Sequence, residues 1–129
     1  MSYLSQVKKP TPQAPVTTIV GFAGSGKSSL AGLFPSPIFI QAENATSVFE
    51  TMPEDLQPAF FPQLPIANAK RNIKTSEVLF EQLRELMTVE HGFKTVVIDS
   101  ITALNIMFEN EVVEFDDKGA SNIGEAQGG

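Results

Sequence analysis

The segment from Gly21 to Ser28 has the residue types and spacing that bind a polyphosphate. Its letters, GFAGSGKS, fit G-x-x-x-x-G-K-[ST] without a mismatch. Glycines let backbone N–H groups approach phosphate oxygens, the lysine ammonium reaches the β- and γ-phosphates, and the serine hydroxyl can ligate Mg²⁺. A glycine-rich turn without function is the weaker alternative, because a chance match has odds of roughly one in a few hundred. We expect the nucleotide contacts to come from Gly21, Ala23, Gly24, Ser25, Gly26, Lys27, Ser28 and Ser29.

A second feature is an apolar run that ends in an acid, Lys94 to Asp99 (KTVVID). Beside a phosphate loop, an aspartate in this place organises the Mg²⁺ shell. Taken alone the pattern is weak, because many apolar strands end in Asp, and Asp99 could instead cap the helix that follows. After a matching phosphate loop the pattern carries more weight. We therefore expect ATP and Mg²⁺ as cofactors, with Ser28 and Asp99 on the metal side.

A carboxylate base for the attacking water is not found next to Asp99, because the next residue is Ser100. Glu43 is the candidate catalytic residue, since it follows the apolar run 38–41 (IFIQ). Parallel strands end on the same edge of a sheet as the phosphate loop. The alternative is that Glu43 is an ordinary exposed acid in a loop.

Short apolar runs alternate with stretches of helical spacing along the chain. The pattern predicts strands at 16–20, 38–41 and 94–99, and helices at 28–34, 75–91 and 101–115; a short helix near 45–51 and a strand near 60–66 are expected in a proline-punctuated stretch. Thr75 is expected to cap the helix at 75–91. The strands are apolar on both faces, which indicates an α/β protein whose parallel sheet is flanked by helices.

Composition excludes several other kinds of protein. The chain has no cysteine, which excludes disulfides and thiolate metal sites, and its one histidine, His91, argues against a histidine metal site. No apolar run approaches the roughly 18 residues of a membrane helix, and residues 1–15 have no secretory h-region. A cytoplasmic protein without a membrane partner is therefore expected. Residues 109–129 hold six acids and one lysine, so most of the net charge of −6 lies there.

Two segments, GFAGSGKSSLAGLFPSPIFIQAEN and KTVVIDSITAL, resemble RecA-like P-loop ATPases. The resemblance is closest to compact phage-encoded ATP-binding proteins of recombination and single-strand annealing, and covers roughly 17–49 and 75–115. It implies a RecA-like P-loop NTPase fold, ATP hydrolysis, single-stranded DNA as partner, a homo-oligomer and a bacterial or phage-infected cytoplasm. That family tends to show Thr-Glu-Gly-Gly where this chain has Ala42-Glu43-Asn44-Ala45, so Glu43 keeps its place without the glycines.

The resemblance also implies a strand between the phosphate-loop strand and the aspartate strand that comes later in sequence. The 14 residues after Phe115 contain no apolar run for it. Either the chain is a truncated N-terminal half, which we expect, or the two motif strands pair directly. The domain plan is then a flexible arm at 1–15, the N-terminal part of an ATPase domain at 16–115, and a loop or frayed end at 116–129. The alternatives are a small P-loop kinase and a nucleotide-binding module without hydrolysis.

Overall fold

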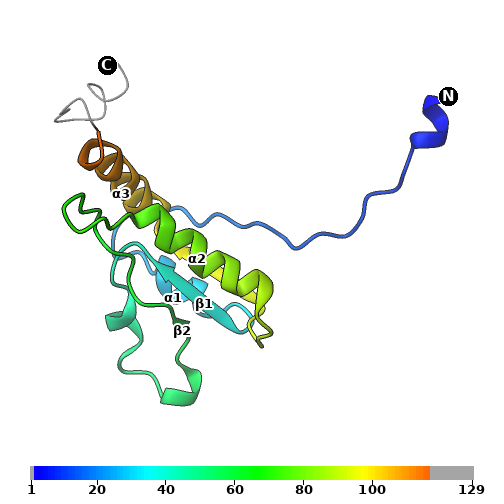
Figure 1. Cartoon of the computed structure of the whole chain (residues 1–129). Helices are drawn as coiled ribbons and strands as arrows, with labels where there is room; N and C mark the ends of the chain where they lie inside the picture. The colour runs from blue at the N-terminus through cyan, green and yellow to red at the C-terminus, as the bar shows by residue number, and fades with distance from the viewer. Residues whose placement is uncertain (1, 117–129) are drawn as a thin grey trace.

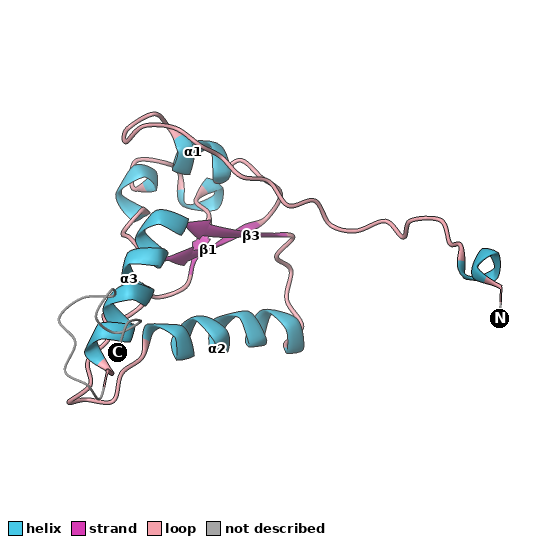
Figure 2. Ribbon diagram, turned by 90° about the horizontal axis from the view of Figure 1, so that it is seen from above, coloured by secondary structure: helices cyan, strands magenta, loops and turns pink. Residues whose placement is uncertain are grey.

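The computed structural model describes residues 2–116, which form a three-layer α/β fold. Three helices flank a small sheet, with α1 on one face and α2 on the other (Figure 2). The elements in chain order are η1 Tyr3–Gln6, α1 Lys27–Ala31, β1 Pro37–Gln41, η2 Thr46–Phe49, η3 Glu54–Leu56, β2 Ala59–Phe60, α2 Thr75–Thr88, β3 Thr95–Asp99 and α3 Ile101–Glu114. None of the helices within residues 2–116 is both long and apolar enough to span a membrane.

The sheet is parallel, with β1 between β2 and β3. The register pairs Ile38 with Val96 and Gln41 with Asp99, so β1 and β3 end at the same edge. The central strand is buried because helices cover both of its faces and a strand lies on each side. The predicted α/β class with a parallel sheet flanked by helices is confirmed.

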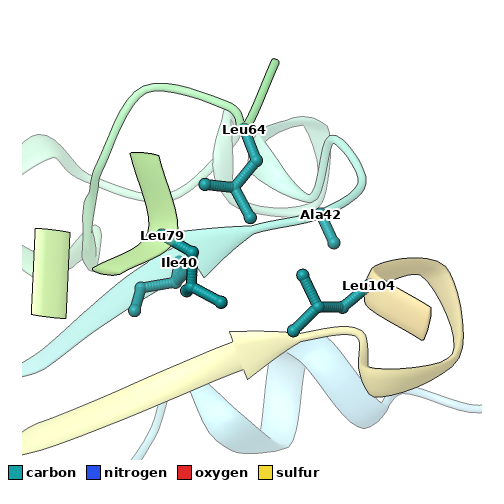
Figure 3. Packing of buried hydrophobic residues seen from close by; sticks show 5 residues of the cluster. All are labelled: Ile40, Ala42, Leu64, Leu79 and Leu104. Atoms are coloured by element: carbon teal, nitrogen blue, oxygen red, sulfur yellow. The ribbon is translucent and has the colours of Figure 1, made fainter. Parts of the chain in front are cut away.

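Alternate side chains of β1 enter two separate cores, as the two-residue period of a strand requires. Phe39 packs on the α1 face, with its ring centroid 5.7 Å from that of Phe49 and 4.9 Å from that of Phe60. Ile40 packs on the opposite face against Leu79 of α2 and Leu104 of α3. Figure 3 shows this second cluster, which Ala42 and Leu64 complete. The two cores fix the end of β1 between α1 and the two long helices.

A side chain of α3, and not the side chain of Thr75, caps the first turn of α2. Glu111 accepts hydrogen bonds from the backbone N of Ser76 at 2.9 Å and from its Oγ at 2.7 Å. Thr75 is fully buried within the helix, and its hydroxyl donates to the carbonyl of Pro65 at 2.7 Å. The prediction that Thr75 caps the helix is therefore wrong, because burial turns its hydroxyl to another segment.

The predicted strand at 16–20 is wrong. Val16 is 97% exposed and Val20 is 89% exposed, and this stretch belongs to no strand of the described sheet. Only Ile19 contacts the core, through the cluster around Phe39. Figure 1 shows the preceding arm running away from the body. β-Branched residues favour an extended backbone, but a strand forms only where a neighbouring strand supplies its hydrogen bonds.

The same finding overturns direct pairing of the two motif strands, because within residues 2–116 the only strand paired with β3 is β1.

Other elements are shorter than predicted. The strand near 60–66 is reduced to Ala59–Phe60, since Pro62 and Pro65 have no backbone N–H for a ladder. The helix near 45–51 is a single 3₁₀ turn, η2. Except for Asp116, the predicted loop or frayed end at 116–129 lies outside the described residues.

Candidate functional site

Two glycines of the loop between residues 21 and 26 have a backbone conformation that favours glycine. Gly24 and Gly26 have φ angles of 77° and 90°, in the left-handed region that favours glycine. A Cβ at Gly21 would lie 2.7 Å from the Oγ of Ser25. The backbone N of Ser25 donates to the carbonyl of Phe22 at 3.1 Å, which closes the turn. The backbone conformation therefore favours glycine at positions 24 and 26, whereas the close contact at position 21 involves a hydroxyl that can rotate away.

Lys27 is the first residue of α1, and its side chain reaches back to the loop. Its Nζ donates to the carbonyls of Gly21 at 2.7 Å and Phe22 at 2.8 Å. The ammonium is therefore held at the loop and presents a positive charge there. The other predicted contact residues of this stretch, Ala23 and Ser29, are exposed.

Ser28 and Asp99 lie 71 residues apart in sequence and are joined by a hydrogen bond. The Oγ of Ser28 donates to the Oδ2 of Asp99 at 2.6 Å. Ser28 lies in the first turn of α1, and Asp99 is the last residue of β3. The alternative that Asp99 caps the next helix is wrong, because the Oγ of Ser100 accepts from the backbone N of Ala103 at 3.2 Å. The Asp99 carboxylate is thus directed to the phosphate loop.

The donor set at this point fits Mg²⁺. The Ser28 hydroxyl and the Asp99 carboxylate offer only oxygen atoms, which this hard cation prefers. Mg²⁺ in nucleotide sites usually takes one or two protein oxygens and completes its shell with phosphate and water. In the part of the chain that the structure describes, no three His, Cys, Asp or Glu side chains cluster as a metal site by themselves.

Glu43 lies at the same edge of the sheet as Asp99. The backbone N atoms of Ala42 and Glu43 both donate to the carbonyl oxygen of Asp99, at 2.9 and 3.2 Å. The Glu43 carboxylate is exposed and has no hydrogen bond or ion pair within residues 2–116. Its backbone is therefore where the sequence expects it, and its role as a base stays a prediction.

Gln41 is a residue of this site that the sequence reasoning missed. It is buried, its Nε2 donates to the carbonyl of Phe61 at 2.9 Å, and its Oε1 accepts from the backbone N of Ala45 at 3.4 Å. The signal was available in the run 38–41, because a glutamine that ends an otherwise apolar buried strand must find partners for its amide. It lies in register with Asp99.

Comparisons with known proteins agree with this arrangement. A sequence model of a family described as an AAA domain matches residues 13–128, which include the loop, all three strands and both long helices. No curated protein and no solved structure matches the chain in the two other comparisons. Since the family match covers most of the chain, and the phosphate loop and Asp99 lie within it, the chain belongs to the AAA domain family, an AAA-type family of P-loop ATPases.

Proposed function

We propose that this chain binds ATP with Mg²⁺ through the loop 21–29 and hydrolyses it. The observation that carries the proposal is the 2.6 Å hydrogen bond between Ser28 and Asp99. It brings the hydroxyl of a phosphate loop and the carboxylate of a distant strand to one point, as nucleotide-bound Mg²⁺ requires. Membership of an AAA-type P-loop ATPase family supports the same reading.

Each residue has a separate task in this proposal. The loop N–H groups bind phosphate oxygens, and the Lys27 ammonium offsets their charge. Ser28 and Asp99 would hold Mg²⁺, which when bound neutralises charge on the transferring phosphoryl group. Glu43, whose carboxylate is free of protein partners within residues 2–116, accepts a proton from the attacking water.

Substitution of Glu43 by Gln tests the hydrolytic part. This change keeps the shape of the side chain and removes the base, so ATP affinity stays within a few-fold while turnover falls by roughly 10²-fold. Phosphate release and ATP binding by calorimetry measure the two quantities. Glu54→Gln is the matched control, because Glu54 is also an exposed acid and lies in η3. If Glu43→Gln turns over as fast as the parent, Glu43 is only a loop acid.

We further propose a RecA-like ATPase that acts on single-stranded DNA, as a homo-oligomer. The support is the similarity of the two motif segments to phage recombination and annealing ATPases. Phosphate release measured with and without single-stranded DNA tests this, with stimulation as the expected result. Transfer of phosphate to a nucleotide acceptor instead of water would favour a small kinase. ATP binding without any phosphate release would favour a binding module.

A further inference from the structure

Gln41 is a polar residue in an apolar place. It is 5% exposed, and a buried amide is costly unless it is hydrogen-bonded. The side chain meets this requirement with backbone partners on two different segments, the carbonyl of Phe61 and the N–H of Ala45. Its own backbone carbonyl accepts from the N of Leu64 at 2.9 Å. Gln41 therefore ties the end of β1 to the segment that follows β2.

The turn that carries Glu43 is held from two directions. On one side, the N–H groups of Ala42 and Glu43 donate to the carbonyl of Asp99. On the other side, the N–H of Ala45 donates to the Gln41 amide oxygen, two residues beyond Glu43. The bond from Ala45 is the long one of this set, at 3.4 Å, and it is buried. The turn has no glycine, and these bonds limit where the Glu43 backbone can lie.

We infer that Gln41 is a positioning residue for Glu43, an inference that rests on the proposed function. Its amide donates to the fixed segment at Phe61 and accepts from the turn at Ala45, and so sets the distance between them. A base must lie within hydrogen-bonding reach of the water it activates. A displacement of about 1 Å can cost roughly 10²-fold in rate, even when its cause lies outside the reacting groups.

Gln82 on α2 is a matched control within the same fold. It is 8% exposed, and its Nε2 donates to the carbonyl of Pro62 at 3.3 Å, next to the partner of Gln41. Its Oε1 is buried without a hydrogen-bond partner within residues 2–116, so it has no bond to the Glu43 turn. Substituting either glutamine by Met removes a buried amide, and the two amides lie in similar surroundings. Only the change at Gln41 releases the turn.

The experiment compares Gln41→Met, Gln82→Met, Glu43→Gln and the double variant Gln41→Met with Glu43→Gln. We expect Gln41→Met to lower kcat for phosphate release by about tenfold or more, with ATP affinity within a few-fold. Gln82→Met keeps the parental kcat, whatever happens to its melting temperature. The double variant is no slower than Glu43→Gln alone, because a positioning residue has no effect once the base is absent.

The outcomes separate this inference from the proposed function. A parent protein that binds ATP but releases no phosphate overturns both. A slow Glu43→Gln variant beside a Gln41→Met variant with parental kcat overturns only the inference. The inference is also overturned if the reduction in kcat of the double variant is the product of the reductions in the two single variants, since Gln41 then acts independently of Glu43. If Gln41→Met does not fold, Gln41→Leu takes its place, because an apolar side chain of another shape also removes both hydrogen bonds of the amide, and the same comparison with the double variant applies.

Discussion

Lys27 and Ser28 are consecutive residues that bind different parts of the molecule. Lys27 donates to two carbonyls of its own loop, and Ser28 donates to Asp99 on β3. In the proposed site, the charge of Lys27 would act on phosphate directly, with or without a metal. In the same site, Asp99 would act on the nucleotide through Mg²⁺ held beside Ser28. Substitution of Lys27 should therefore weaken ATP binding with and without Mg²⁺, whereas substitution of Asp99 should weaken it mainly when Mg²⁺ is present.

Asp99→Asn should remove the strengthening of ATP binding by Mg²⁺. The amide keeps an oxygen that can accept from Ser28 but has lost the negative charge that attracts the cation. Titration of ATP with Mg²⁺ and with a chelator measures the effect, and the metal-free affinity should change by no more than a few-fold. Asp55→Asn, at an exposed acid of η3, is the control. Equal losses in both conditions would remove Asp99 from the metal site.

Two acidic side chains of α3 bind α2 and the segment that precedes it. Glu111 binds the first turn of α2 through Ser76, and Glu114 accepts from the backbone N of Ala69 at 3.0 Å. Two acids of the negatively charged C-terminal part therefore have defined structural partners. Glu109, on the same helix, is exposed, and among the described residues it accepts only from Asn105, at 3.1 Å. Glu111 and Glu109 should therefore contribute differently to the free energy of unfolding.

Glu111→Ala should lower the free energy of unfolding by about 1 kcal/mol, the usual cost of losing a helix N-terminal cap. Glu109→Ala should change it by less than about 0.5 kcal/mol, as exposed substitutions do. Urea denaturation followed by circular dichroism compares the two variants. Equal effects at both positions would mean that the bonds from Ser76 contribute nothing measurable to the packing of α2 on α3.

The sequence predicted the two long helices more accurately than the extended run at 16–20. The apolar spacing in 75–91 and 101–115 located both long helices to within a few residues, because packing of one helical face decides them. The run 16–20 was misjudged, since a strand depends on a partner that local sequence does not name. The contact of Gln41 with Phe61 and the capping role of Glu111 were missed for the same reason, because these partners lie 20 and 35 residues away in sequence.

At the scale of the whole molecule, β3 is an edge strand within residues 2–116. Val96 is 46% exposed and Ile98 is 36% exposed, so the edge is apolar as well as unpaired on its outer side. Unpaired apolar edges template pairing with other chains. The purified chain should therefore associate as its concentration rises.

Val96→Lys should shift this association toward the monomer, because a charged side chain on an edge strand opposes strand pairing. Val112→Lys is the matched control, since Val112 is similarly exposed, at 44%, but lies on α3. Sedimentation velocity over a range of concentrations distinguishes the variants. A parent chain that stays monomeric throughout, or equal effects of both lysines, would exclude β3 as the associating edge.

The central claim is that the loop 21–29 binds ATP, and calorimetric titration of the parent chain and Lys27→Ala with ATP and Mg²⁺ tests it most directly. The account predicts binding by the parent and a loss of roughly 100-fold or more in Lys27→Ala, because the substitution removes the ammonium that is held at the loop carbonyls. Lys70→Ala, at an exposed lysine outside the loop, should bind like the parent. Equal ATP affinity in the parent and Lys27→Ala would contradict the account.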